Sequence, residues 1–361
     1  MKILLPYSSH HMDLDGTFVT GGVEKFIQLL YHNLDAEVIP VPCSKEEQKT
    51  RTVTSKVVSI AKNHDVDVIV SNYDSQPLTN NLRNIIPEVP VMWISHTGAN
   101  GISIINKIKN IKSFVETGGT LFLMSERQYL LHNKKSQVHN GCDMILNGGY
   151  INSAFCTGDE APSEIEYDAV TVGRLDPLKN PFWLHRKMSG SGRHSLIMST
   201  YLKHRSSAQF LEYKSKNEHW KYPQETVYDL PYKEVMDTMS KGACYVSTCY
   251  DETWGITALE SLAHGLPLVL VTDKYEKHGS DGIPASMDHV RKVRSTISKS
   301  DFIEIVDHFK TYSMDQRREI SDLTKEKHTR EKWKSSIMNA IDKTIENNSK
   351  ISAHNLMSFT Q

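Results

Sequence analysis

The sequence predicts an α/β protein with two doubly wound domains, each built on a parallel β-sheet. The chain has 361 residues, which corresponds to about two domains of ordinary size. Short apolar segments alternate with helical patterns in both halves. Gly, Asp, Pro and Ser cluster between the halves, as expected of a linker. We therefore predict domains at 1–152 and 168–330, followed by a C-terminal helix and tail at 331–361.

Strands are predicted where β-branched and apolar residues form short runs bounded by polar residues. In the first half these runs lie at 2–7, 36–42, 66–73 and 89–96. In the second half they lie at 168–175, 194–200, 225–230, 243–250 and 266–273. Helical patterns separate them, such as 22–34 and a polar helix ending near Asn63. Alternating strands and helices of this kind are typical of a parallel sheet with helices on both faces.

The charged segment from about Asp301 to Ile345 predicts further helix. Its Trp333, Ile337 and Ile341 recur at a spacing of four and would form one apolar stripe. We expect this stripe to pack, and the N-terminal domain is a candidate partner.

Composition excludes several classes of protein. Hydrophobic residues make up 39% and charged residues 24%, as in soluble globular proteins. With 42 Lys+Arg against 43 Asp+Glu, the net charge of −1 gives no global signature of a nucleic-acid or membrane partner. No apolar run approaches the roughly 18 to 20 residues of a membrane span, and the N-terminus lacks a signal-peptide pattern. Five scattered cysteines without C-x-x-C spacing predict neither disulfides nor zinc, so we expect a cytoplasmic protein.

The strongest chemical pattern is the segment 250–271, where a strand leads through a loop into a helix expected to begin near Thr253. Ligands of doubly wound sheets bind beyond the carboxyl ends of the strands. A helix N-terminus there offers unpaired N–H groups and a positive dipole to a phosphate. The backbone groups expected at this position belong to Trp254, Gly255, Ile256 and Thr257.

Glu252 and Glu260, eight residues apart in this segment, resemble the E-x7-E signature of glycosyltransferase family 4 and its relatives, as do the small residue, Gly and Pro of AHGLP. Without the other motifs, the same spacing also fits a purely structural pair. One glutamate would then favour the dipole at the helix N-terminus, and the other would face solvent. Further segments resemble the family in its own order, namely TGGVEKFIQLL, WISHTG, LNGGYINSAF and VGRLDPLKNP. The resemblance implies the GT-B fold, in which two Rossmann-like domains face a central cleft. The N-terminal domain would bind the acceptor and the C-terminal domain the nucleotide-sugar.

The resemblance also implies roles for individual residues. Arg174 and Lys179 are cationic and would stabilise the departing diphosphate. The alternative is that both residues simply lie in a surface turn after a strand. Glu252 would position the transferred sugar together with His96, although a lone histidine is often structural. Glu260 would bind the ribose. The other donor contacts would come from backbone that approaches the phosphate closely, at Gly21, Gly22 and residues 254–257.

The implied activity is that of a retaining glycosyltransferase with a nucleotide-sugar donor, a UDP-sugar by resemblance, and a hydroxyl acceptor. We expect no cofactor and no metal. Asp13-Leu14-Asp15 imitates a DxD metal motif, but it lies in a polar loop before Gly21. His10 and His11 are adjacent, so their side chains point apart. The sequence contains no G-x-G-x-x-G motif, which disfavours a dehydrogenase of similar architecture.

The acceptor is indicated only by local charge. Residues 97–140 carry six basic side chains against two acidic ones, and Lys107, Lys109 and Lys112 lie within six positions. A solvated helix face, a polyanionic acceptor and an anionic membrane surface are all compatible with this cluster. The charged C-terminal helix is similar to that of the glucosyltransferases by which T-even phages modify hydroxymethylcytosine.

We therefore favour double-stranded DNA as acceptor, in a host cytoplasm if the chain is phage-encoded. The first alternative is a bacterial envelope enzyme acting on a lipid-linked sugar or polysaccharide, with peripheral membrane contact. The second alternative is a non-catalytic module that binds a sugar nucleotide.

Overall fold

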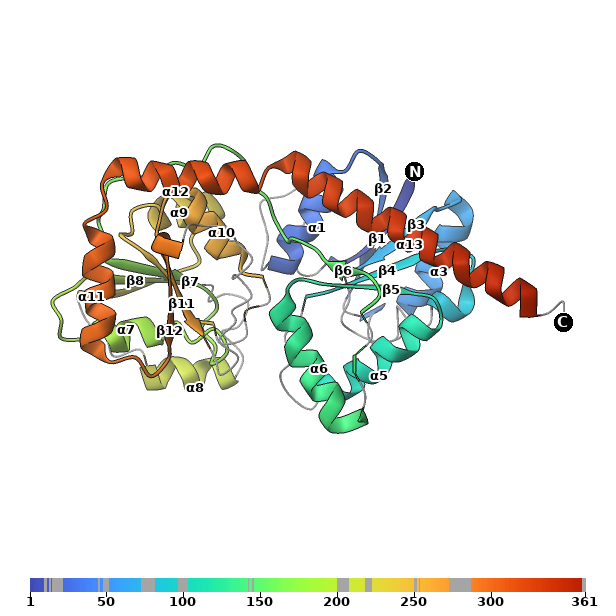
Figure 1. Ribbon diagram of the computed structural model, residues 1–361, viewed down its shortest axis with the longest axis horizontal. Coiled ribbons are helices and arrows are strands. Elements are labelled where there is room, and N and C mark those ends of the chain that lie inside the picture. The colour runs from blue at the N-terminus through green and yellow to red at the C-terminus, as the bar shows by residue number, and fades with distance from the viewer. Residues whose placement is uncertain are drawn as a thin grey trace. The chain divides into compact units, whose positions relative to one another are not determined.

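The computed structural model describes residues 1–9, 12, 14, 22–44, 46–47, 52–72, 82–96, 103–141, 143–144, 146–199, 208–217, 223–249, 252, 254–272 and 287–358. The chain forms two compact units (Figure 1). Unit 1 comprises Met1–Ser153 together with Glu331–Gln361, and unit 2 comprises Ala154–Arg330. Each unit is built on its own β-sheet.

The sheet of unit 1 is parallel, with strand order β2-β1-β3-β4-β5-β6. Its strands are β1 (Lys2–Ser8), β2 (Glu37–Cys43), β3 (Val68–Ser71), β4 (Val91–Ser95), β5 (Thr120–Leu123) and β6 (Gly149–Tyr150). Every residue of β3, β4 and β5 is buried. Their continuous apolar sequences fit this position, because helices cover both faces of such a sheet.

Five helices of unit 1 are described: α1 (Gly22–Asn33), α3 (Thr52–His64), α5 (Ser103–Glu116), α6 (Glu126–Asn140) and α13 (Arg330–Ser358). In Figure 1, α5 and α6 lie below the sheet, whereas α1 and α13 lie above it. The apolar stripe of α13 is buried at Trp333, Ile337 and Ile341, as its spacing predicts. The indole N–H of Trp333 donates to the carbonyl of Asn152 at 3.1 Å, and its ring lies edge-on to Phe26. These contacts fix the start of α13 on unit 1.

The sheet of unit 2 is also parallel, with strand order β12-β11-β10-β7-β8-β9. Its strands are β7 (Ala169–Val172), β8 (Ser195–Ser199), β9 (Gln224–Tyr228), β10 (Tyr245–Ser247), β11 (Leu268–Thr272) and β12 (Val290–Arg294). The chain adds strands on one side of β7 up to β9 and then continues on the other side with β10. The neighbours β7 and β10 therefore form the topological switch point of a doubly wound sheet.

The helices of unit 2 are α7 (Phe182–Met188), α8 (Ala208–Asn217), α9 (Tyr232–Met239), α10 (Ile256–Ala263), α11 (Lys299–Lys310) and α12 (Met314–Lys327), with a short 3-10 turn at Met287–His289. Figure 1 shows α9, α10 and α12 on one side of the sheet and α7 and α8 on the other.

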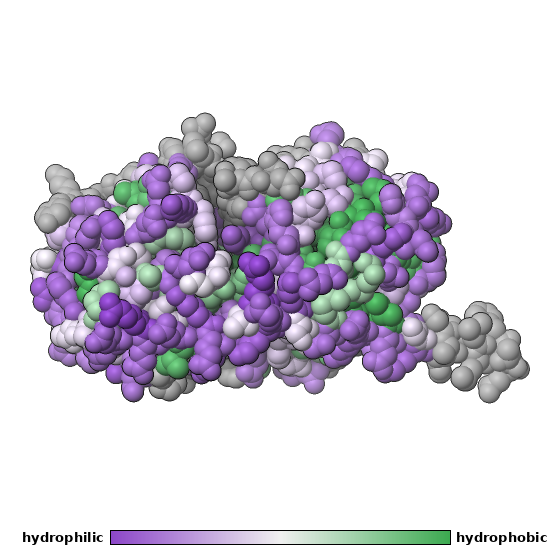
Figure 2. Space-filling model, turned by 90° about the horizontal axis from the view of Figure 1, so that it is seen from above, coloured by the Kyte–Doolittle hydropathy of each residue, from purple (hydrophilic) through white to green (hydrophobic). Residues whose placement is uncertain are grey.

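Hydrophilic residues cover most of the face seen in Figure 2, which looks onto the upper side of Figure 1.

A buried arginine explains the glycine of the AHGLP segment. Arg317 of α12 is fully buried, and its guanidinium donates to the carbonyls of Ser163, Ser240, Gly242 and Gly265. Gly265 has φ +76, and a Cβ there would lie 2.4 Å from the carbonyl oxygen of Arg317. Only glycine fits this close approach without strain. The contact fixes the end of α10 against α12.

The predicted fold class is confirmed, since both halves form parallel sheets with flanking helices. The short strands β5 and β6 and the charged strand β12 were not predicted. The helix predicted to begin near Thr253 begins at Ile256, because Gly255 has φ +81 and interrupts the helical backbone. The single C-terminal helical segment is three helices, because serine caps begin α11 and α12, and the last helix continues past Ile345 to Ser358.

Cys43, Cys156, Cys244 and Cys249 are buried and form no disulfide among the described residues, whereas Cys142 lies outside them. None of the helices in the described ranges is both long and apolar enough to cross a bilayer.

The buried histidine of α7 makes the stability of unit 2 depend on pH. His185 lies between Ser195 and Thr226, with ring nitrogens 2.9 Å and 3.2 Å from their hydroxyl oxygens. Burial lowers its pKa from 6.5 to about 4. The unfolded chain therefore takes up this proton at higher pH than the folded chain, and acid favours unfolding. The loss should begin near pH 6.5, grow as the pH falls to 4, and reach on the order of 3 kcal/mol.

We predict that His185→Gln reduces the pH dependence of the free energy of unfolding between pH 6.5 and 4, measured by urea denaturation. The exposed His308→Gln variant is the control and should behave like the wild type. Contributions of other histidines are present in all three proteins and cancel in the comparison. Equal pH dependence in His185→Gln and wild type would contradict this account.

Candidate functional site

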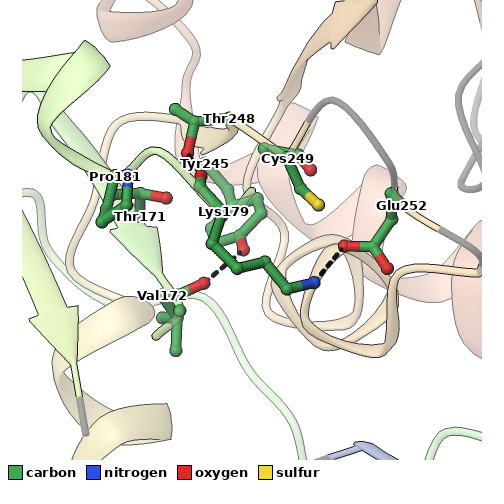
Figure 3. Close-up of a pocket in the computed structure, with 10 residues that line it drawn as sticks. Thr171, Val172, Lys179, Pro181, Tyr245, Thr248, Cys249 and Glu252 are labelled. Carbon is green, nitrogen blue, oxygen red and sulfur yellow. Dashed lines mark hydrogen bonds and ion pairs between the residues drawn. The ribbon is translucent and has the colours of Figure 1, made fainter. Parts of the chain in front are cut away.

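A small pocket opens at the switch point of the unit 2 sheet. Its walls come from the end of β7 (171–173), from Tyr245 of β10, from the end of β10 with the loop after it (247–249), and from Lys179, Pro181 and Glu252 (Figure 3). Because parallel strands end at the same edge of the sheet, the loops after β7 and β10 meet here. The topology therefore brings together residues that lie about seventy positions apart in the sequence.

An ion pair joins the two loops. Lys179 Nζ lies 2.9 Å from Glu252 Oε2, and Figure 3 shows the two side chains pointing toward one another. The side chain of Lys179 is 30% exposed and that of Glu252 is 12% exposed. Burial alone would lower the pKa of Lys179, but the Glu252 carboxylate raises it more, so the pKa lies above its ordinary value. Lys179 therefore keeps its positive charge across the physiological pH range.

The backbone around Lys179 is held in a tight turn. The N–H of Lys179 donates to Asp176 Oδ1 at 2.8 Å, and the Thr248 hydroxyl donates to the Lys179 carbonyl at 2.6 Å. The next residue, Asn180, has φ +43, a conformation that asparagine tolerates better than most residues. Its side-chain oxygen accepts hydrogen bonds from Arg186 and from the hydroxyl of Tyr213. Lys179 thus projects from a fixed turn rather than from a loose loop.

Arg174, the second cation predicted for this site, belongs to the same loop. Its Nε lies 3.2 Å from Asp176 Oδ2, and nearly half of its side chain is exposed. The prediction did not include Asp176, although it stands two residues after Arg174 and three before Lys179. Each predicted phosphate-binding cation therefore has a carboxylate partner, Lys179 with Glu252 and Arg174 with Asp176.

The N-terminus of α10 follows the β10 loop. Gly255 is the N-cap residue with φ +81 and has no side chain to cap the first turn. The N–H of Ala258 donates to the Gly255 carbonyl, whereas helix geometry gives the N–H groups of Ile256 and Thr257 no acceptor within the helix. The Trp254 side chain is 4% exposed and packs edge-on against His328. The Thr257 hydroxyl lies 2.8 Å from that of Tyr245, a residue of the pocket wall. Backbone amides, rather than these two side chains, are available here to an anion.

Glu260 lies one helical turn beyond Thr257 on α10. Its Oε1 is 2.6 Å from the hydroxyl of Tyr232, the first residue of α9. Tyr232 was not among the predicted site residues, because no motif marks it.

Among the predicted residues of unit 1, His96 lies at the carboxyl end of a central strand. His96 follows β4, and its Nε2 is 2.9 Å from Asn72 Oδ1 after β3. The ring of Phe26 in α1 lies edge-on to His96 at 5.1 Å. Gly22 is the first residue of α1, whereas Gly21 lies outside the described residues.

The residues considered as metal ligands near the N-terminus, His10, His11, Asp13 and Asp15, also lie outside the described residues. Within the described part of the chain, no three His, Cys, Asp or Glu side chains are arranged to hold a metal ion.

The basic segment of unit 1 is only partly exposed. Lys109 and Lys112 of α5 face solvent, and Lys112 Nζ lies 3.8 Å from Glu116 Oε1. The side chain of Lys107 is not among those that the structure describes. Arg127 is 3% exposed, so it adds nothing to the surface charge that the residue count suggests.

Comparison with solved structures identifies the fold. The chain superposes on AviGT4, a glycosyltransferase involved in avilamycin A biosynthesis, with a TM-score of 0.62 at 11% identity, covering 96% of this chain and 98% of that one. For a sucrose-phosphate synthase from Thermosynechococcus elongatus the TM-score is 0.66 at 11% identity, covering 99% of both chains. For Anabaena Alr3699/HepE in complex with UDP it is 0.62 at 12% identity, covering 94% and 99%.

No protein-family model matches the sequence, and a search of curated proteins finds no significant match. At such low identities the structural likeness concerns the fold alone. The two parallel sheets with their flanking helices are those of the GT-B class, which confirms the predicted fold.

Proposed function

We propose that this protein is a glycosyltransferase that moves a sugar from a UDP-sugar to a hydroxyl acceptor. The observation that carries the proposal is the Lys179–Glu252 pair at the switch point of a doubly wound sheet, beside the N-terminus of α10. A lysine, an arginine and a helix N-terminus suit a diphosphate. The names of structural neighbours support the same class, since AviGT4 is a glycosyltransferase and HepE was solved with UDP.

In the proposed reaction the bond between the anomeric carbon and the diphosphate oxygen breaks, and the diphosphate leaves with the electron pair. The acceptor oxygen bonds to the anomeric carbon, and its proton passes to the leaving diphosphate. Negative charge thus develops on the diphosphate, where Lys179, Arg174 and the α10 amides would stabilise it. These positive groups would perform the role that a metal ion has in other transferases, so we propose a metal-independent reaction.

We further propose that the anomeric configuration is retained, with the acceptor entering on the face that the diphosphate leaves. Glu252 and His96 would orient the sugar, and Glu260 would bind the ribose. The hydrogen bond from Lys179 stabilises the Glu252 carboxylate as an acceptor of sugar hydroxyls. A carboxylate stabilised in this way is a weaker nucleophile, which favours an orienting role.

We predict that Lys179→Ala and Arg174→Ala each lower kcat for UDP-sugar turnover by on the order of 10² to 10³, the effect of losing one preorganised charged group. Glu252→Gln should also lower kcat, yet bind UDP several-fold more tightly, because a carboxylate no longer repels the diphosphate. Turnover should persist in excess EDTA. UDP release and UDP affinity are the measurements.

The matched control is Lys241→Ala, which removes another Lys–Glu pair of unit 2, also 2.9 Å apart, outside the pocket. Near-normal turnover in both Lys179→Ala and Arg174→Ala would exclude this site as the donor site. Loss of turnover in EDTA, restored by magnesium or manganese, would instead indicate Asp13 and Asp15 as ligands.

For the acceptor we propose 5-hydroxymethylcytosine in double-stranded DNA. The exposed Lys109 and Lys112 on α5 support this choice, since phosphate contacts hold a duplex without reading its sequence. The target base would have to leave the stack or be reached in the groove. An envelope acceptor is the alternative, because the same lysines suit an anionic membrane surface. A non-catalytic sugar-nucleotide module would bind UDP without turnover.

We predict that hydroxymethylated duplex DNA accepts sugar, whereas the same duplex with unmodified cytosine does not. Affinity should fall steeply with salt as phosphate contacts release counterions. Replacing Lys107, Lys109 and Lys112 together by alanine should weaken DNA binding and flatten the salt dependence, while donor hydrolysis continues. An unchanged salt slope in this variant would exclude these lysines from DNA binding. No transfer at any salt would exclude DNA as acceptor.

A further inference from the structure

A hydrogen bond between two helices of unit 2 fixes the orientation of Glu260. The hydroxyl of Tyr232, at the start of α9, lies 2.6 Å from Glu260 Oε1 on α10. An ionised carboxylate has no hydrogen to give, so Tyr232 is the donor. The distance is that of a strong O–H···O⁻ hydrogen bond.

The surroundings keep this donor protonated. Burial of the hydroxyl raises the pKa of Tyr232, and the negative charges of Glu260 and Glu160 raise it further. The side chain as a whole is 49% exposed. Tyr232 therefore presents part of its surface to solvent while its hydroxyl keeps the proton that it donates to Glu260.

Glu260 lies close, along α10, to a residue that contacts the pocket wall. Thr257 and Glu260 are three residues apart, so they lie on the same face of the helix. The Thr257 hydroxyl contacts Tyr245, which lines the pocket. Glu260 stands five positions after Gly255, which corresponds to roughly 7 to 8 Å along the helix axis. A diphosphate at the N-terminus of α10 would thus leave its nucleoside within reach of Glu260.

We propose that Tyr232 is a positioning residue that holds the Glu260 carboxylate ready to accept a hydrogen bond from a ribose hydroxyl of the bound nucleotide. This inference rests on the proposed function, because it assumes that the pocket takes a nucleoside diphosphate. A glutamate side chain has three rotatable bonds, and ordering it on binding costs affinity. Tyr232 orders the side chain before the nucleotide arrives. Tyr232 itself has no role in the bond-breaking step.

The test compares dissociation constants of UDP, 2′-deoxy-UDP and 3′-deoxy-UDP by calorimetry. Wild type should bind the analogue that lacks the contacted hydroxyl about 10- to 100-fold more weakly than UDP. Glu260→Ala should lose this discrimination. Tyr232→Phe should weaken UDP binding by about 3- to 10-fold, with a smaller effect on that deoxy analogue. In the Glu260→Ala background, Tyr232→Phe should have no further effect.

Tyr312→Phe is the matched control, since it removes a tyrosine hydroxyl of the same unit that donates to the Asp288 carbonyl. It should leave all three dissociation constants unchanged. Discrimination that stays intact in Tyr232→Phe, or equal weakening of UDP and both analogues, would overturn the positioning role alone. Failure of the wild type to bind UDP would overturn the donor assignment and this inference together.

Discussion

The ion pair between Lys179 and Glu252 connects two loops that only the sheet topology brings together. One loop follows β7 and the other follows β10, and these strands are neighbours because the strand order reverses between β9 and β10. Ligands of doubly wound sheets bind at such points. The helix α10 begins at Ile256, four residues after Glu252, so its N-terminus follows directly on the loop that supplies the carboxylate of the pair.

The pocket wall carries one cation and one carboxylate, Lys179 and Glu252, and the loop after β7 carries a second such pair, Arg174 and Asp176. Lys179 and Arg174 are paired with Glu252 and Asp176, so neither is a bare positive charge that would attract any anion. In the proposed donor complex, a diphosphate would have to share the cations with these carboxylates. Selectivity would then depend on contacts to the rest of the ligand, such as the proposed contact between the ribose and an oriented Glu260.

Much of the fold could be predicted because strand and helix periodicity is strong in the buried parts of both sheets. The strands β1, β4, β8 and β11 coincide closely with apolar runs. Strand prediction failed where a strand is rich in charged residues or very short. The edge strand β12 reads VRKVR, in which charged residues hide the alternation, and β6 has only two residues.

The sequence could predict only those site residues that belong to a recognisable motif. Lys179 and Glu252 could be named as members of one site, but their mutual hydrogen bond depends on the tertiary fold. Tyr232 was missed for the same reason, since a tyrosine in the first turn of a helix carries no sign of the glutamate that it contacts 28 residues later. Asp176 contacts Arg174 and Lys179 within its own loop, but it belongs to no motif that would mark it. Gly265 was noticed as part of a pattern, whereas its physical cause is the backbone of Arg317.

The most direct measurement is a crystal structure of the protein with UDP. The account places the diphosphate within hydrogen-bond distance of Lys179 Nζ and of the first backbone amides of α10, with the ribose toward Glu260. A diphosphate bound away from the carboxyl ends of β7 and β10, or bound only to residues of unit 1, would contradict the account.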